Sequence, residues 1–467
     1  MQEYKTPGVY IEEIPKLPPS VASVETAIPA FIGYTEKAQW KEEGDLKLKP
    51  RRITSLLEYE QYFGKPDPEK ESISVTIKTS PALEVNVKID ETKRSKFLMH
   101  YCLQMFFANG GGPCWIISVE DYTTGGGIIS SASLKGGLDE AEKINEITLL
   151  LFPDAINLTA ATDYYDLYDT AIDQCRLLQD RFTVMDVYHS AENGDNWRED
   201  IALFRNTLAG TTDGLKYAAA YFPRIYTGVD YVTGSDETVK ITGFAEAQDM
   251  ATLKTVNNAY YFLAKNAIST AQMLLPPSSA VVGIYALVDR QKGVWKAPAN
   301  VNIDNAIRPE ILITNRDQES LNVDVQAGKS INVIRKFEGA GPALVWGART
   351  LAGNDNEWRY INVRRFFIMV EESVKNASEQ FVFESNDRNT WIRVKGMIDN
   401  YLTQLWRAGA LMGTTEREAF FVHVGIGETM TEQDILEGRM IIEIGLAAVR
   451  PAEFIILRFM HKMMADS

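Results

Sequence analysis

Short apolar runs alternate with amphipathic segments along the first part of the chain. The apolar runs are typical of buried strands and are "AIPAFIGY" (27–34), "PCWIISV" (113–119), "ITLLLF" (147–152), "FTVMDV" (182–187) and "YAAAYF" (217–222). Segments with helical spacing lie between them, at about 97–109, 139–145, 163–179 and 197–210. Helices that alternate with short apolar strands indicate an α/β layer with a largely parallel sheet. The pattern therefore predicts an α/β domain over residues 21–325.

One segment of this domain has the alternation of a hairpin. Apolar residues occupy every second position at Ile73, Val75 and Ile77, and again from Leu83 to Ile89, with "TSPA" between the two runs. Period-two alternation on both sides of turn residues predicts two paired strands. We expect a β-hairpin insertion at about 65–96.

The pattern changes after residue 325. The runs "KSINVIRKF" (329–337), "ALVWGART" (343–350) and "WRYINVRR" (358–365) are expected to be strands. Two helices should follow, one with Val370 and Val374 on its apolar face and one with Ile398 and Leu402. The strand-like runs "AFFVHVGI" (419–426) and "RMIIEIGLAAV" (439–449) complete the segment. We interpret residues 326–447 as a second, α+β domain.

Both ends of the chain are apolar, whereas termini are usually polar and frayed. Residues 1–20 are expected to form an extended arm, because prolines at 7, 15, 18 and 19 interrupt any helix. Residues 448–467 are expected to form a second arm. The strand-like residues of the two arms are Val9, Tyr10, Ile11 and Ile14 at the front, and Phe454, Ile455, Ile456, Leu457 and Phe459 at the back. A lone strand cannot pair its own backbone groups, so each arm needs the edge of a sheet to which it can add. If that edge belonged to another copy, the contact would be heterologous and would generate rings or helical filaments.

The composition excludes several classes of protein. The chain has 467 residues, of which 45% are apolar and 24% charged, as in ordinary globular proteins. Its net charge of -15 argues against nucleic acid or an anionic membrane as a partner. Three cysteines without paired spacing predict neither a disulfide framework nor a zinc site. No apolar stretch has membrane-spanning length and no leader pattern is visible, so we expect assembly in the cytoplasm without a signal peptide or membrane insertion.

Motifs that would indicate an enzyme are weak. The segment "AGKS" (327–330) is similar to the end of a phosphate-binding loop. However, Val323 stands where that motif needs glycine, and a β-branched run follows where it needs a helix. The four histidines have no metal-ligand spacing, and no GxSxG motif is present. We predict a protein that is not an enzyme, with no catalytic residues, cofactor or metal; a nucleotide-linked α/β enzyme that uses "AGKS" is the alternative.

Several segments together resemble the contractile tail sheath protein family. They are "TPGVYIEEI" (6–14), "FFANGGGPCWIISV" (106–119), "PPSSAVVGIYALVDRQKGVWKAPANV" (276–301), "FVFESNDRNTWIRVKGMIDNYLTQLWRAGALMG" (381–413) and "ILEGRMIIEIGLAAVRPAEFIILRF" (435–459). They follow one another in order over nearly the whole chain. The family occurs in contractile bacteriophage tails, R-type pyocins and phage-tail-like contractile injection systems.

The resemblance implies a structural protein that forms helically stacked six-membered rings around an inner tube protein. Baseplate and cap proteins would bind at the two ends. The sheath would shorten and drive the tube through a target envelope, using stored conformational energy and no nucleotide. The α/β domain would lie outside and the α+β domain inside, and each terminal arm would complete a small sheet in a neighbouring copy. The particle would be assembled in the bacterial cytoplasm and then released or held in the envelope; a non-contractile self-assembling shell is the alternative.

For the contact with the tube, the resemblance implies a charged element of the C-terminal domain. The candidate is "TMTEQDILEGR" (429–439), where Thr431 can cap a helical turn that presents Glu432, Asp434 and Glu437. The alternative interpretation is a solvated, well-capped turn without a partner.

Overall fold

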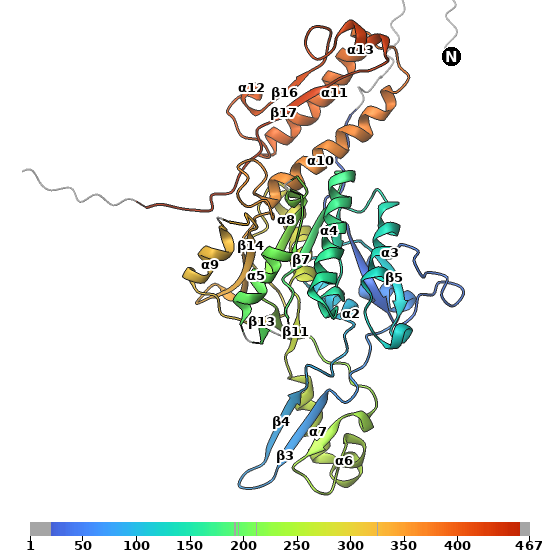
Figure 1. Ribbon diagram of the computed structural model, residues 1–467, viewed down its shortest axis with the longest axis vertical. Helices are drawn as coiled ribbons and strands as arrows, with labels where there is room; N and C mark the ends of the chain where they lie inside the picture. The colour runs from blue at the N-terminus through green and yellow to red at the C-terminus, as the bar shows by residue number, and fades with distance from the viewer. Residues whose placement is uncertain (1–19, 191–192, 195, 212, 325, 458–467) are drawn as a thin grey trace, which may run out of the picture. The chain divides into compact units, whose positions relative to one another are not determined.

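The structure is a computed structural model that describes residues 20–190, 193–194, 196–211, 213–324 and 326–457 (Figure 1). These residues form two compact units. The larger unit contains residues 25–369 and 450–457, and the smaller contains residues 20–24 and 370–449. The chain therefore leaves the larger unit at residue 369 and returns to it at residue 450.

A nine-stranded sheet forms the centre of the larger unit, in the order β12-β15-β14-β8-β7-β6-β1-β5-β2. Its strands are β1 (Pro29–Thr35), β2 (Arg51–Ile53), β5 (Cys114–Asp121), β6 (Leu149–Leu151), β7 (Phe182–Asp186), β8 (Ala218–Phe222), β12 (Val301–Asn302), β14 (Ile331–Phe337) and β15 (Gly341–Trp346). The six strands from β14 to β5 are parallel, and the three edge strands are antiparallel to their neighbours. Every residue of β1, β6, β7 and β8 is buried, which explains why these strands read as continuous apolar runs.

Helices connect the parallel strands of this sheet, as the alternating pattern predicts (Figure 1). They are α1 (Leu56–Phe63), α2 (Met99–Ala108), α3 (Ser131–Glu142), α4 (Ala161–Leu178), α5 (Trp197–Thr207), α8 (Ser278–Lys292) and α9 (Asn315–Asn322). The helix expected at 139–145 is wrong in its position, because α3 begins at Ser131. The glycines at 136 and 137 hide the helical pattern in the sequence. Gly137 allows a close approach to the sheet, since a Cβ atom there would lie 2.5 Å from Ile32 Cγ2.

The hairpin insertion is present and is part of a larger lobe. Strands β3 (Ile73–Lys78) and β4 (Glu84–Ile89) pair antiparallel over their whole length. A third strand, β10 (Lys240–Thr242), joins β3 in parallel from far along the chain. Helices α6 (Met250–Val256) and α7 (Asn258–Ser269) follow this strand, and α7 packs on β4. A small separate sheet contains β9 (Ile225–Thr227), β11 (Met273–Leu275) and β13 (Ala306–Pro309).

The expected boundary at residues 325 and 326 falls inside the large sheet. Strands β14 and β15 both follow this boundary, yet β14 pairs with β8 of the α/β layer. The division between the units lies instead between residues 369 and 370, within the 18-residue helix α10 (Ile361–Ser378). The strand expected at 358–365 is therefore wrong, because "INVRR" is the first part of α10. Over eight residues its spacing fits a strand and a helix equally well, and the helical repeat becomes clear only when the segment is followed to Val374.

The smaller unit combines helices with a short sheet. It contains the second half of α10, α11 (Arg388–Arg407), α12 (Glu416–Ala419), β16 (Phe420–His423), α13 (Glu432–Leu436) and β17 (Glu443–Leu446). Helix α11 packs against β16 and is capped by Asp387, whose carboxylate accepts hydrogen bonds from the backbone N–H groups of Asn389 and Thr390. None of the described helices is both long enough and apolar enough to cross a membrane.

Candidate functional site: the chain ends and the two-stranded sheet

The sheet of the smaller unit consists of β16 and β17 within the described residues. The two strands pair antiparallel, from Phe420 opposite Leu446 to His423 opposite Glu443. One face is buried by Phe420 and Val422, whereas Phe421 on the other face is 45% exposed. A two-stranded sheet is marginally stable in water, and its outer edges present backbone groups that can accept further strands. The described part of the unit therefore contains a two-stranded sheet with an exposed apolar side chain on one face.

The C-terminal segment leaves its own body without joining a sheet. Residues 450–457 form no helix or strand. Four consecutive apolar side chains in this segment are 70–80% exposed, namely those of Phe454, Ile455, Ile456 and Leu457. Consecutive exposed apolar residues are unusual on a soluble protein and mark a surface that binds another one. Residues Val9, Tyr10, Ile11, Ile14 and Phe459 lie outside the described residues.

The expected start of the C-terminal arm at residue 448 is two residues early. Ala448 forms a bridge with Leu411, and the Val449 backbone N–H donates to the carbonyl oxygen of Ala410. These residues therefore still belong to the smaller unit. The chain returns to the larger unit at Arg450.

Glu453 fixes the beginning of this segment to the larger unit. Arg349 Nε donates to Glu453 Oε1 at 2.9 Å, and its Nη2 donates to Oε2 at 2.6 Å. Asn322 Nδ2 and the Tyr360 hydroxyl donate to the same carboxylate, at 2.7 and 3.2 Å. Burial alone would raise the pKa of Glu453, but the hydrogen bonds from Arg349 and its neighbours outweigh burial and hold the pKa below its usual value. This cluster is not evident in the sequence, because Arg349 lies 104 residues before Glu453.

The residues that follow the expected N-terminal arm are bound to the smaller unit instead. The Val24 backbone N–H donates to Ser373 Oγ at 3.0 Å, and Ser23 Oγ donates to the Tyr401 hydroxyl at 3.1 Å. These residues lie just after the arm expected over residues 1–20. The described residues next to the two arms therefore belong to different units of the molecule.

The candidate tube-contact turn forms the capped helix α13. Thr431 Oγ1 accepts from the Asp434 backbone N–H, and the Asp434 carboxylate accepts from the Thr431 backbone N–H at 2.8 Å. Hydrogen bonds from Thr431 and the charge of Arg439 lower the pKa of Asp434. Arg439 Nη2 also lies 2.7 Å from Glu437 Oε2. Glu432 has no ion pair in the described part of the chain, so it is the carboxylate of the three that is most available to a partner.

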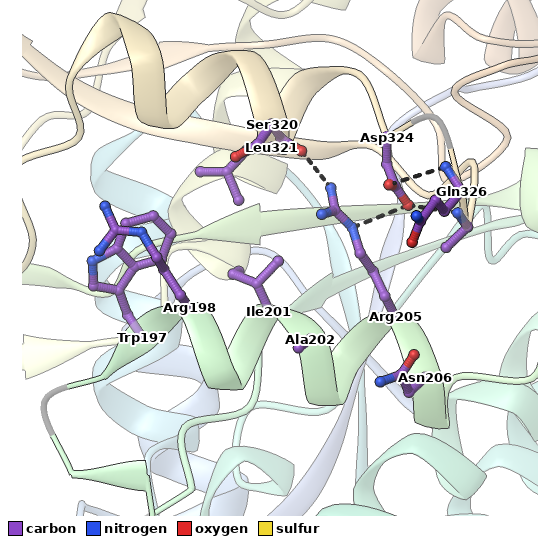
Figure 2. A pocket seen from close by; sticks show the side chains of 11 residues that line it. Trp197, Arg198, Ile201, Ala202, Arg205, Asn206, Ser320, Leu321, Asp324 and Gln326 are labelled. Atoms are coloured by element: carbon purple, nitrogen blue, oxygen red, sulfur yellow. Dashed lines mark hydrogen bonds and ion pairs between the residues drawn. The ribbon is translucent and has the colours of Figure 1, made fainter.

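A cavity of about 570 Å³ lies beside the "AGKS" segment, between α5 and α9 (Figure 2). Its cations already have partners. Figure 2 shows the Arg205 guanidinium between Asp324 and the carbonyl oxygen of Ser320, to which Nη2 donates at 2.6 Å. The Lys329 ammonium is buried and donates to the backbone carbonyl oxygens of Arg205 and Leu208, and burial lowers its pKa. The strand β14 follows directly, so Lys329 occupies a position unlike that of a phosphate-binding lysine at a helix N-terminus.

Comparisons with known proteins match this chain to tail sheath proteins. Residues 353–461 match the family described as the phage tail sheath C-terminal domain. The tail sheath protein of Vibrio phage KVP40 is 26% identical over 213 residues, or 45% of this chain. The tail sheath protein of Burkholderia phage BcepMu is 29% identical over 150 residues, or 31% of this chain. These matches span 29% and 31% of the two phage proteins, less than a third of their lengths.

Solved structures match the chain from end to end. The helical sheath of the anti-feeding prophage in its contracted state is 32% identical, with a TM-score of 0.66, over 98% of this chain and 100% of that one. The chain belongs to the contractile tail sheath protein family. A second sheath, from the PVC extracellular contractile injection system in its contracted state, is 30% identical with a TM-score of 0.66 over 99% of both chains. Membership of the sheath family confirms the resemblance inferred from the sequence.

Proposed function

We propose that this sheath subunit polymerises as stacked six-membered rings around an inner tube protein and contracts to drive that tube through a target envelope. The observation that supports this most strongly is the end-to-end similarity to contracted sheaths of two injection systems. A chain in the anti-feeding prophage baseplate structure is 32% identical over 98% of this chain, which supports a contact with baseplate proteins. The particle assembles in the bacterial cytoplasm, with a cap protein at the end opposite the baseplate.

The terminal arms connect the subunits by adding strands to the sheet of β16 and β17 in neighbouring copies. In an extended strand, Phe454 and Ile456 point to one face and Ile455 and Leu457 to the other. Such a strand needs cover on both faces, and an edge of an incomplete sheet provides backbone partners as well. Full burial of one such side chain contributes about 1.5–3 kcal/mol, so four of them provide a substantial part of a subunit contact.

The exchange of arms explains why the assembly is a helix. Each copy gives an arm and accepts one at a different surface, and such heterologous contacts close into rings or continue as filaments. The N-terminal arm, with Val9, Tyr10, Ile11 and Ile14, makes the corresponding contact with another neighbour, and Phe459 extends the C-terminal strand. Because the described residues next to the two arms belong to different units, each unit of a subunit is tied to a different set of neighbours.

Contraction requires no nucleotide in this proposal. If the extended lattice is metastable, each subunit needs to release only on the order of a few kcal/mol when it repacks. The arms keep the lattice connected while the units move as rigid bodies, with hinge points in the proline- and glycine-containing parts of the arms. Movement of one ring strains the strands that it shares with the next ring, so the change propagates along the sheath.

Helix α13 makes the contact with the inner tube. Glu432 is exposed and forms no ion pair with any described residue, whereas Arg439 partly neutralises Asp434 and Glu437. A basic surface on the tube protein would fit this helix. Contacts between exposed charges are weak and are screened by salt, which suits a surface that must release the tube during contraction.

A truncation that ends the chain at Glu453 tests the proposal. Residues 454–457 make no regular secondary structure with their own body, so the shortened protein should fold with an unchanged melting temperature. Negative-stain electron microscopy should show wide hollow tubes for the full chain and none for the truncated chain. Normal tubes from the truncated chain would contradict the role of the arm. Tubes that show a single helical state after acid or denaturant treatment would favour a static shell.

A further inference from the structure

Each nitrogen of the Arg349 guanidinium has a hydrogen-bond acceptor within the larger unit. The Arg349 side chain is 4% exposed, and it forms a bidentate pair with Glu453, which is 20% exposed. The remaining nitrogen, Nη1, donates to the backbone carbonyl oxygens of Asn322 and Gly353, both at 3.4 Å. A bidentate pair of this kind has a fixed geometry, unlike a mobile contact between exposed charges.

A second set of bonds connects Arg349 to the large sheet. Asn332 in β14 is buried, and its Oδ1 accepts from the Arg349 backbone N–H at 2.8 Å. Asn332 Nδ2 donates to the Arg349 carbonyl oxygen at 2.8 Å and to the Ala220 carbonyl oxygen in β8 at 3.2 Å. A continuous set of hydrogen bonds therefore runs from Glu453 through Arg349 to two strands in the large sheet.

The cluster lies between the point where the chain returns to the larger unit and the exposed apolar residues 454–457. Arg450 Nη1 donates to the Asn356 carbonyl oxygen at 2.9 Å, so the chain touches the larger unit as soon as it leaves the smaller one. Glu453 follows three residues later, and the next side chain, Phe454, is already 70% exposed. Within the described residues, the cluster thus lies directly before the four exposed apolar residues 454–457.

We propose that Arg349, Glu453, Asn322 and Tyr360 form the anchor of the C-terminal arm, which fixes its point of departure on the α/β unit and transmits force between the arm and the large sheet. The proposal rests on the exchange of arms described above. An arm that is fixed at its base reaches its partner sheet with a high effective concentration, whereas a longer flexible tether lowers that concentration. Glu453 is in this sense a positioning residue for assembly, because it does not itself contact the neighbouring copy.

Glu453→Gln in the full chain tests this role, with Glu310→Gln as the matched control. Arg224 donates to both carboxylate oxygens of Glu310, at 2.9 and 2.6 Å, so the control removes one charge from a bidentate Arg–Glu pair in the same unit but away from the arm. Tyr360→Phe is a milder second variant that removes a single hydrogen bond and leaves the ion pair. Hydrogen exchange of the unassembled chain and the protein concentration needed for tube formation are measured for all three.

In Glu453→Gln, we expect the amide of Arg349, which donates to Asn332 Oδ1, to exchange at least tenfold faster, with exchange in the rest of the chain unchanged. Tube formation should require at least tenfold more protein for Glu453→Gln, a smaller increase for Tyr360→Phe, and the wild-type concentration for Glu310→Gln. Assembly of Glu453→Gln at the wild-type concentration would overturn the proposal, as would an equal loss in Glu310→Gln, which would indicate general destabilisation. Normal tubes from the chain truncated after Glu453 would instead contradict the exchange of arms itself, so the two failures are distinguishable.

Discussion

Replacement of Ile456 by serine should weaken assembly without affecting folding. Ile456 is 77% exposed in the isolated chain, so its side chain contributes little to the stability of its own body. Burial of the exposed three-quarters of this isoleucine between subunits contributes about 1.1–2.3 kcal/mol, taken from about 1.5–3 kcal/mol for full burial. Because 1.4 kcal/mol corresponds to a factor of ten, this loss raises the protein concentration needed for assembly by about 6–40 fold.

The assay is sedimentation of assembled tubes over a series of protein concentrations, with the melting temperature of the unassembled protein measured in parallel. Leu57→Ser is the matched control, since Leu57 on α1 is also 77% exposed. We expect the control to assemble as the wild type does. An unchanged critical concentration for Ile456→Ser, or an equal increase for Leu57→Ser, would refute the reasoning that these side chains are buried specifically by a neighbouring copy.

Two further predictions concern the larger unit. Gly136→Ala should raise the free energy of unfolding by about 0.5–1 kcal/mol, because a Cβ atom at position 136 meets open space and alanine favours the helix. Gly137→Ala should lower the free energy of unfolding by about 1–3 kcal/mol, because a Cβ atom at position 137 would lie 2.5 Å from Ile32 Cγ2. Urea denaturation measures both, and a stabilised Gly137→Ala would contradict the packing of α3. Burial raises the pKa of Asp186 to about 7 despite hydrogen bonds from Ser278, so the folded state holds a proton that the unfolded state releases near pH 4. The contribution of Asp186 to stability is therefore full below about pH 4 and is lost as the pH rises to about 7. Stability measured from pH 4 to 8 should fall less steeply in Asp186→Asn than in the wild type, and identical slopes would contradict this assignment.

The α/β layer could be predicted from the sequence because its central strands are buried on both faces. Strands such as β6 and β7 appear as short, wholly apolar runs, and the amphipathic helices between them have a clear repeat. The hairpin of β3 and β4 could be predicted as well, since only one face of β3 is buried and its apolar and polar residues therefore alternate. The sheath family could also be recognised, because its segments are spread over nearly the whole chain.

Features that depend on distant partners could not be predicted. The assignment of β14 to the large sheet depends on its pairing with β8, more than 100 residues earlier, and nothing in its own spacing indicates this. The first turns of α10 contain β-branched residues whose spacing also fits a strand. Glu453 looks like an ordinary polar residue before an apolar run, and only the fold brings Arg349 and Tyr360 to its carboxylate.

The central claim is that a subunit gives its C-terminal strand to a different copy. A cryo-electron microscopy reconstruction of tubes assembled from the full chain tests it most directly. We predict that residues 454–457 are hydrogen-bonded as a strand to the sheet of β16 and β17 in a neighbouring subunit, with Glu453 still bound to Arg349 of its own chain. A reconstruction in which these residues fold back on their own body, with no strand shared between subunits, would contradict the account.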